Sequence, residues 1–409
     1  MDLDTTAQKM IEQIDKNADR IKDLSLYIHS HPETASTEYK AAKILCDELE
    51  KNGFKVERGL EALRPVNNEE IFLKTAFKAI FKGKEEGSNI AILLEYDALP
   101  IGHGCGHNLI CAAGLSAALG LGGIMKDLPG TLVVYGTPAE ENGLKGNKTE
   151  MVHAGHFKDI DIVLANHPGD RWDTKANWLA FRKLYVDFHG VASHAASAPE
   201  KGISALKAAC LFFNGVDALR EFVRSDTRMH GRIVNGGRMC NIVPDYSQVE
   251  FGVRAFDLVY VDELKEKVTN IIKGACLMTG AKADYEWGYG VNAPIIVPTL
   301  SDFVTENIKG FGVEKNKIKP WTAYASTDLG EVGVNCPTMN LFFAAAPEGV
   351  NLHTEEMVAA SGSERALDNM ILASKILAYS AYKLFSNWRQ VKDIKQEFEQ
   401  IRRNLYGGM

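Results

Sequence analysis

The chain has 409 residues, of which 45% are hydrophobic, and it carries a formal net charge of −7 at pH 7. That length is enough for roughly two or three domains with substantial cores. An acidic chain without a long basic block is not expected to bind nucleic acid or an anionic membrane surface. The sequence shows no secretory signal and no uninterrupted run of ~18 apolar residues, so we expect a cytoplasmic protein that does not span a membrane.

Seven cysteines are scattered along the chain, and their odd number and wide spacing argue against a disulfide framework. Most are expected to be buried as small apolar side chains in a reducing compartment. Cys105 is the exception, because its neighbours are residue types that bind metals.

The first half of the chain is predicted to alternate between strands and helices. Residues 5–52 are predicted to form two helices, and the apolar run at 89–96 is typical of a buried strand in a parallel sheet. Two further strand-and-loop segments follow, TLVVYGTPAEEN and DIDIVLANHPG, with a short helix between them. This alternation indicates an α/β fold with a mostly parallel sheet flanked by helices, in which functional groups gather at the carboxyl ends of the strands.

The pattern changes between residues 182 and 291. The predicted order there is strand, helix, strand, strand, helix, strand, which is the ferredoxin-like α+β arrangement. From residue 292 the alternation of helices and strands resumes, and the tail from 391 is predicted to be a charged helix in solvent. We therefore expect a discontinuous α/β domain, 1–181 and 292–409, with an inserted domain at 182–291.

The segment GHGCGHN places Cys105 and His107 among glycines directly after a predicted strand. A C-x-H pair alone is more often a buried cysteine beside a core histidine than a metal site. The glycines let the backbone fold tightly enough to point both side chains inward, and an ordinary turn does not explain the histidine and cysteine.

Further candidates lie at other predicted strand ends and in loops. Glu140 and Glu141 follow one strand, His167 ends another, and His353 lies in the loop GVNLHTEEM. Each alone is unremarkable, since adjacent carboxylates usually face water and a lone histidine is more often a capping or core residue. Adjacent glutamates can, however, divide two tasks, one binding a metal while the other holds a water.

Taken together, five of these side chains supply sulfur, nitrogen and oxygen donors: Cys105, His107, Glu141, His167 and His353. Such a mixed set fits Zn²⁺, Mn²⁺ or Co²⁺ better than Ca²⁺ or Mg²⁺, and it leaves the choice among the first three open. With the other glutamate of the pair holding a water, the set predicts metal-assisted hydrolysis.

Eight ordered motifs carry a resemblance to a known family: YDALP, GHGCGHN, GTPAEEN, NHPG, SHAASAPEKGISAL, NGGRMCNIVPDYSQVEFGVRA, ASTDLGEV and NLHTEE. Over nearly its whole length the chain resembles the aminoacylase/carboxypeptidase family of metallo-amidohydrolases, peptidase family M20. Within that family it is most similar to the branch of auxin-conjugate, aminobenzoyl-glutamate and β-alanyl-dipeptide hydrolases. The resemblance implies a zinc-exopeptidase-like catalytic domain and an inserted lid domain that forms a homodimer.

The resemblance implies that the five donors named above bind one or two divalent ions, with the cysteine able to bridge two. The sequence departs from the family pattern in three places. Asn108 stands where aspartate is commoner, NGLKG at 142–146 replaces a glycine-rich segment, and Glu95 stands where distant relatives carry a histidine ligand. His103 fits the local pattern but is not expected to be a ligand.

The resemblance also implies roles outside the ligand set. Glu140 corresponds to the general base and Asp97 to the carboxylate that orients the site. His194 corresponds to a lid histidine that stabilises the oxyanion in the partner's active site, and Asn241 and Arg254 to groups that hold the substrate. From the residues alone, a surface ion pair for Arg254 and a polar residue leading a helix for His194 would be favoured.

The predicted function is a metal-dependent amidohydrolase that cleaves the amide bond of an N-acyl amino acid or small dipeptide. The motifs are specific for the family and leave the acyl and amine sides of the substrate open. Three alternatives remain: an idle metal-binding scaffold, a hydrolytic deaminase or carbamoyl hydrolase on the same site, and a thiol enzyme with Cys105 as nucleophile. The thiol enzyme would leave Glu140 and Glu141 without a task.

Overall fold

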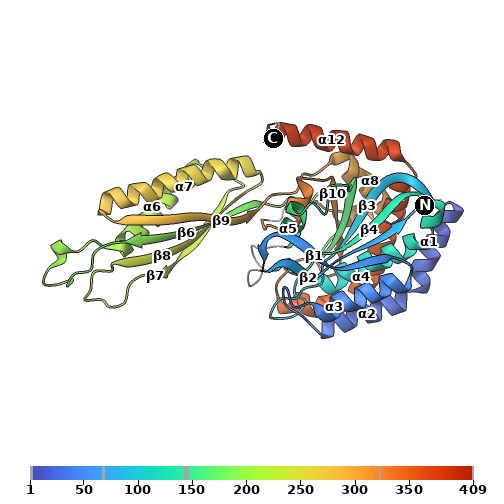
Figure 1. Ribbon diagram of the computed structural model, residues 1–409, viewed down its shortest axis with the longest axis horizontal. Helices are drawn as coiled ribbons and strands as arrows, with labels where there is room; N and C mark the ends of the chain where they lie inside the picture. Colours follow the sequence, from blue (N-terminus) through green and yellow to red (C-terminus); the bar gives the residue numbers. More distant parts are fainter. Residues whose placement is uncertain (1–2, 67–69, 142–146, 322–323, 408–409) are drawn as a thin grey trace. The chain divides into compact units, whose positions relative to one another are not determined.

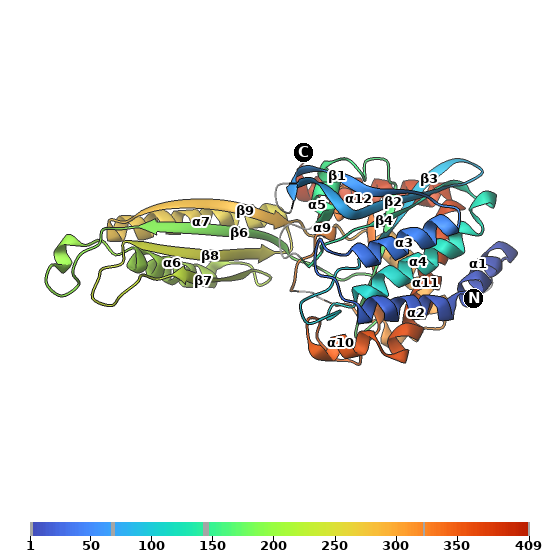
Figure 2. The ribbon, with the colours of Figure 1, turned by 60° about the horizontal axis from the view of Figure 1, so that its bottom comes forward.

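The computed structural model describes residues 3–66, 70–141, 147–321 and 324–407 (Figures 1 and 2). The chain forms two compact units. The first comprises residues 1–177, 294–323 and 327–409, and the second comprises residues 178–293 and 324–326. Within the described residues, no helix combines the length and apolar character needed to cross a membrane.

The described part of the first unit is built around a sheet with the strand order β1-β2-β4-β3-β5-β10. These strands are β1 (Lys55–Val66), β2 (Glu70–Lys82), β3 (Glu85–Leu94), β4 (Pro129–Gly136), β5 (Ile162–Gly169) and β10 (Thr338–Ala344). β4, β3, β5 and β10 pair in parallel, and the hairpin β1–β2 joins them through an antiparallel pairing of β2 with β4. The prediction of a mostly parallel sheet is therefore confirmed.

Helices cover both faces of this sheet, because successive residues of its central strands point to opposite sides and are apolar on both. Ile92 of β3 belongs to the larger core, which includes α4 (His107–Gly122) and α11 (Glu364–Phe385). Leu93 belongs to a separate core on the other face, beneath α5 (Asn147–His153) and α9 (Leu329–Gly333). The prediction of helices on both sides of the sheet is also confirmed.

The prediction of two helices over residues 5–52 is wrong, since three helices occupy this region. They are α1 (Thr5–Lys16), α2 (Ala18–Ser30) and α3 (Tyr39–Lys51). The break between the first two lies at Asn17, whose backbone stays in the right-handed helical region. Neither a glycine nor a proline marks this break, so the sequence pattern predicted one continuous helix there.

The remaining helices of the first unit are α8 (Pro298–Gly310), α10 (Glu355–Ser361) and α12 (Trp388–Tyr406).

The prediction that the tail forms a helix in solvent is wrong for one face of α12. Val391, Ile394 and Phe398 of α12 are buried in the larger core, although the rest of that helix is charged. Their spacing of three and four residues gives one apolar stripe, which anchors the helix to the sheet domain.

The second unit contains a four-stranded antiparallel sheet in the order β7-β8-β6-β9, with two helices packed on it (Figure 1). Its elements are β6 (Ala180–His189), α6 (Ala205–Leu219), β7 (Arg228–Asn235), β8 (Tyr246–Ala255), α7 (Leu258–Thr279) and β9 (Lys282–Val291). This order confirms the predicted ferredoxin-like arrangement.

Both units also contain short 3-10 helices. Those of the first unit are Met125–Asp127 and Lys315–Lys317, and those of the second are Pro199–Lys201 and Arg220–Phe222.

Candidate metal centre and active site

The side chains singled out in the first unit meet at one edge of its sheet. β3 leads directly into Glu95 and Asp97, β4 leads into Glu140 and Glu141, and β5 carries His167 near its end. Because β3, β4 and β5 run parallel, their carboxyl ends share this edge.

The glycine-rich segment brings two more donors to the same edge. Gly106 precedes α4 with a left-handed backbone, φ 75°, which favours glycine over any other residue. A Cβ atom at Gly106 would lie 2.6 Å from Cγ of Pro168, so glycine is also needed for the close approach to β5. The turn thereby places Cys105 before the helix and His107 in its first turn, beside the end of β5.

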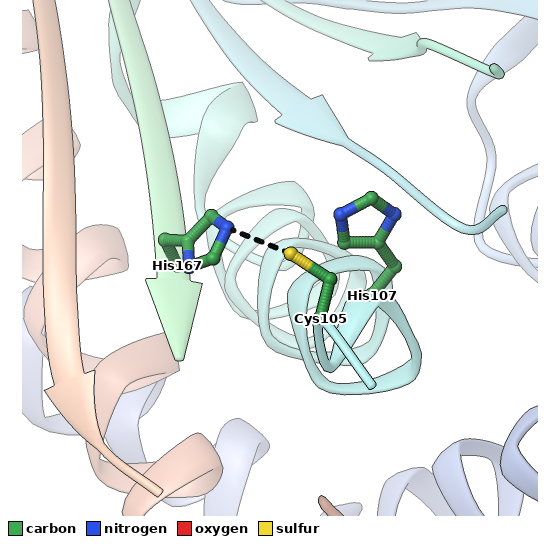
Figure 3. A group of neighbouring side chains, drawn as sticks. All are labelled: Cys105, His107 and His167. Atoms are coloured by element: carbon green, nitrogen blue, oxygen red, sulfur yellow. Dashed lines mark hydrogen bonds between the residues drawn. The ribbon is translucent and has the colours of Figure 1, made fainter. Parts of the chain in front are cut away.

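The five predicted ligands and Glu140 form three overlapping groups, and within each group the donor atoms lie within 4.8 Å of one another. The groups are Cys105 with His107 and His167, Cys105 with Glu141 and His353, and His107 with Glu140 and Glu141. Figure 3 shows the Cys105 sulfur pointing at the His167 ring, and the distance from Sγ to Nε2 is 3.6 Å.

Hydrogen bonds on the outer nitrogens orient both buried histidines. Nδ1 of His107 donates to Oδ1 of Asp97 at 3.0 Å, since a carboxylate oxygen accepts. Nδ1 of His167 donates to the carbonyl of Pro168 at 2.7 Å. In each ring Nε2 therefore keeps its lone pair for a metal, which is the arrangement usual for histidine ligands.

Glu141 and His353 complete the set of donors. The backbone N–H of Glu141 donates to Oδ2 of Asp97 at 2.8 Å, so the same aspartate orients two predicted ligands. Oε1 of Glu141 lies 3.1 Å from Nε2 of His353, whose own backbone has φ 65°. The carboxylate of Glu141 and the ring of His353 raise each other's tendency to be charged: hydrogen bonding to Glu141 raises the pKa of His353.

The residues present fit a divalent metal. Nε2 of His107 is buried without a hydrogen-bond partner among the described residues, and its nearest carboxylate oxygens belong to Glu95 at 3.7 Å and Glu141 at 3.9 Å. Burial holds the pKa of the Cys105 thiol well above its usual range. A buried thiol of this kind is a poor free nucleophile, and it becomes a thiolate readily beside a metal ion.

The surroundings of Glu140 raise its tendency to hold a proton. Burial, followed by the nearby carboxylates of Glu95 and Asp328, raises the pKa of Glu140 well above its usual range. Its Oε1 accepts a hydrogen bond from the hydroxyl of Thr327 at 2.8 Å. A carboxylate with a raised pKa binds a proton more tightly, as a general base near neutral pH requires.

Sequence reasoning missed Glu38, which lies beside the segment that carries Glu140. Glu38 is fully buried, and its Oε1 accepts the backbone N–H groups of Ser36 at 2.7 Å and Ala139 at 2.9 Å. Both residues have left-handed backbones, with φ 67° and 60°, and the other non-glycine residue with positive φ in the described chain is His353. Backbone strain thus gathers at this edge of the sheet, where Glu38 fixes the residue before the proposed base.

A second missed feature is a buried chain of charges beside Glu140. Nζ of Lys148 is fully buried, lies 2.9 Å from Oε1 of Glu95, and forms an ion pair with Asp328. Burial opposes charge on Glu95 and on Lys148. The Lys148 ammonium nevertheless lowers the pKa of Glu95, and the carboxylates of Asp328 and Glu95 raise the pKa of Lys148. Glu95, which departs from the family pattern, is therefore matched by a lysine ammonium.

The other departures from the family pattern have structural explanations where the structure describes them. Nδ2 of Asn108 donates to Oγ of Ser25 and to the carbonyl of Ser361, tying the start of α4 to neighbouring segments. Nε2 of His103 donates to the carbonyl of Ile28 at 3.2 Å, and the ring belongs to none of the three donor groups. The segment 142–146 lies outside the described residues.

The predicted residues of the second unit lie at two ends of its sheet. His194 and Asn241 are exposed neighbours, since the backbone of Ala195 donates to the carbonyl of Asn241 at 2.9 Å. Arg254 lies near the other end of β8, about 26 Å from its first residue Tyr246 at ~3.3 Å per residue. The structure therefore does not bring Arg254 together with the other two within this unit.

Arg254 is half-buried and held from two sides. Its guanidinium lies 4.6 Å from the centre of the Phe181 ring, and Nη1 donates to Oγ of Ser326 at 3.2 Å. Nε is buried without a hydrogen-bond partner in the described residues. That unused donor is the kind of group that binds an oxygen of a ligand.

The fold and the site define a metal-dependent hydrolase, and comparisons with known proteins agree. A family profile described as a peptidase dimerisation domain matches residues 181–277. The Xaa-Arg dipeptidase of Mus musculus is 32% identical over 97% of this chain and 93% of its own. One of the subunits of the p-aminobenzoyl-glutamate hydrolase of Escherichia coli is 28% identical over 95% of this chain and 94% of its own.

Solved structures show the same fold. A dinuclear metal-binding peptidase of the M20 family from Bacillus subtilis covers 91% of this chain and 99% of its own, with a TM-score of 0.71 at 18% identity. An aminobenzoyl-glutamate utilization protein from Klebsiella pneumoniae covers 90% and 97%, with a TM-score of 0.66 at 21% identity. The chain belongs to the M20 family of metal-dependent peptidases and amidohydrolases, and it is an enzyme acting on C–N bonds.

Proposed function

We propose that this enzyme hydrolyses the amide bond of dipeptides or N-acyl amino acids, with Glu140 as the general base. The observation that carries the proposal is the convergence of five donor side chains at one sheet edge, with the Glu140 carboxyl beside them. Nε2 of His107 is buried without a hydrogen-bond partner in the described chain, and a bound metal would account for it.

Cys105, His107, Glu141, His167 and His353 would hold one or two divalent ions, Zn²⁺, Mn²⁺ or Co²⁺. A bound ion would supply a more acidic water and polarise the amide carbonyl. Asp97 keeps His107 in the ligand tautomer and fixes the backbone of Glu141. Cys105 belongs to two of the donor groups, so its sulfur would serve as a ligand in either of them.

Glu140 accepts the proton of the attacking water and returns it to the amine as the C–N bond breaks. Its raised pKa favours the first transfer, and the same carboxyl then acts as the acid. The idle-scaffold alternative leaves this raised pKa and the strained Ala139 beside it unexplained. The thiol alternative conflicts with the buried, poorly acidic Cys105.

We propose that Arg254 binds the carboxylate at the amine end of the substrate. The relatives named as Xaa-Arg dipeptidase and p-aminobenzoyl-glutamate hydrolase act, by those names, on amides of amino acids with a free carboxylate. A guanidinium recognises that group through paired hydrogen bonds, and Nε of Arg254 is available for one of them. The substrates that we expect first are dipeptides with a basic carboxyl-terminal residue.

We propose that the second unit joins two copies of the chain, with His194 and Asn241 serving the partner's active site. The match of residues 181–277 to a peptidase dimerisation domain supports the homodimer. His194 and Asn241 lie at the end of the sheet away from Val291 and Ala180, where the chain crosses to the first unit.

The test is amine release from a substrate panel by enzyme stripped with chelator and refilled separately with Zn²⁺, Mn²⁺ or Co²⁺. The panel contains Xaa-Arg and Xaa-Lys dipeptides, β-alanyl dipeptides, p-aminobenzoyl-glutamate, N-acetylcysteine and one N-carbamoyl amino acid. We expect activity to return only with metal and to vanish in Glu140→Gln, which should still bind metal. Wild-type rates in Glu140→Gln would eliminate the proposed base, and release only from the carbamoyl compound would favour the carbamoyl hydrolase.

A further inference from the structure

The motif ASTDLGEV, residues 325–332, has no task in the roles proposed above, yet it contacts the proposed base. Thr327 is 7% exposed, and its hydroxyl donates to Oε1 of Glu140 at 2.8 Å. The two residues are 187 positions apart in the sequence, so this contact exists only because the chain returns to the sheet edge here.

The geometry of Thr327 fixes where its single hydroxyl proton points. The backbone N–H of Leu329 donates to Oγ1 of Thr327 at 3.2 Å, which uses one lone pair of the hydroxyl oxygen. A threonine hydroxyl has one proton and two lone pairs, so the proton remains free to bind Glu140. The hydroxyl thus cannot rotate freely between alternative acceptors without losing the bond from Leu329.

The next residue anchors this turn. Asp328 forms a buried ion pair with Lys148, and Oδ2 of Asp328 also accepts the backbone N–H of Lys148 at 3.2 Å. Lys148 in turn pairs with Glu95 at the end of β3. Thr327 is therefore held against a rigid point of the sheet edge rather than on a free loop.

We propose that Thr327 is a positioning residue for Glu140: its hydroxyl occupies Oε1, so that Oε2 is the oxygen that takes and returns the proton. The inference rests on the proposed function, in which Glu140 is the base. As the water oxygen bonds to the carbonyl carbon, its proton moves to Oε2. The same proton passes to the amide nitrogen when the C–N bond breaks, and Glu140 returns to its starting state.

The kinetic test compares Thr327→Val, which keeps the shape and removes the hydroxyl, with Thr327→Ser, which keeps the hydroxyl. We expect Thr327→Val to lower kcat about ten- to a hundred-fold, the range for a hydrogen bond to a charged group. KM and bound metal should stay within about twofold of the wild type. Thr327→Ser should recover most of the lost rate, which a merely space-filling role would not produce.

Thr338→Val is the matched control, because the buried Thr338 hydroxyl donates to the carbonyl of Cys336 instead of a reacting group. It should lower the thermal midpoint without changing kcat. An unchanged kcat in Thr327→Val, with Glu140→Gln inactive, would overturn this inference and leave the proposed function standing. Full activity in Glu140→Gln would overturn both.

A measurement without turnover checks the contact itself. The thermal midpoint is compared among the wild type, Thr327→Val, Glu140→Ala and the double variant. If the two side chains interact, the loss of midpoint caused by Thr327→Val should shrink by more than half when Glu140 is already alanine. Equal losses in both backgrounds would contradict the contact, and with it the positioning role.

Discussion

Asp97 holds His107 through one carboxylate oxygen and the backbone of Glu141 through the other, at 3.0 and 2.8 Å. One side chain thereby fixes two predicted ligands that come from different segments of the chain. Asp97 itself is fully enclosed, with 1% of its surface exposed. Its two bonds hold these two members of the predicted donor set in place through the protein itself.

The first prediction follows from this arrangement. Asp97→Asn presents a neutral amide to His107, which holds the ring in its ligand tautomer less firmly than the carboxylate does. We expect metal affinity to fall roughly 10- to 100-fold, as is usual for partners of histidine ligands. Competition against a chromophoric chelator measures it. Asp161→Asn, which disturbs a comparable bond to the backbone of Asn89, is the control and should leave affinity unchanged.

The second prediction concerns Cys105, the sulfur donor of two groups. Cys105→Ser replaces a soft ligand by a hard one, so binding of Zn²⁺ and Co²⁺ should weaken far more than binding of Mn²⁺. Titration of the stripped protein with each ion measures the three affinities. Equal weakening for all three ions would place the sulfur outside the coordination shell. Cys111→Ser, also buried but outside the donor groups, controls for the loss of a buried thiol.

The third prediction concerns the buried ammonium of Lys148. Lys148→Met leaves the carboxylates of Glu95 and Asp328 without their cation, and breaking a buried pair in this way costs about 3–5 kcal/mol. Adding Asp328→Asn to that variant should restore part of the loss, because one unpaired charge disappears. Urea denaturation of the chelator-stripped proteins measures the free energy of unfolding. A double variant less stable than Lys148→Met would contradict the pairing.

The fourth prediction is a pH dependence of stability. Burial, with the nearby charges of His107 and His29, lowers the pKa of His103 to about 3 from its usual 6.5. As the pH falls below 6.5, the unfolded chain gains a proton that the folded protein refuses until about pH 3. The stabilisation that comes from the neutral His103 ring is fully present above pH 6.5. Between pH 6.5 and about pH 3 it is lost, and the free energy of unfolding falls by roughly 1.4 kcal/mol per pH unit.

Denaturation of the stripped protein between pH 7 and 4 tests the fourth prediction. His103→Gln should flatten the curve, while His31→Gln, on an exposed ring, should leave its slope unchanged. Parallel curves for His103→Gln and the wild type would show that another group carries the dependence.

The sequence was informative wherever local pattern determines structure. Apolar runs ending in polar residues located β3, β4 and β5, and the shared direction of parallel strands brought Asp97, Glu140 and His167 to one edge. The order of elements in the inserted domain followed from alternation alone. The five donors could be named because each lies next to a recognisable strand end or in a loop motif.

The sequence was uninformative where contacts join distant segments. Glu38 meets Ala139 across 101 positions, and Lys148 meets Asp328 across 180. A buried lysine or glutamate looks the same in a sequence as an exposed one, since the pairing that permits burial is set by the fold. The spacing of Val391, Ile394 and Phe398 is that of an apolar stripe on a helix, but the many charged residues of α12 favoured a fully solvated helix.

Ser326 and Thr327 are consecutive, yet Ser326 binds Arg254 in the second unit and Thr327 binds Glu140 in the first. Surface connections between domains usually tolerate insertions and deletions well. Here a single added or missing residue between these two would pull one of the hydroxyls off its partner. In related proteins, this junction should therefore keep its length even where its residues change. Libraries that vary the length of linkers should leave it unchanged.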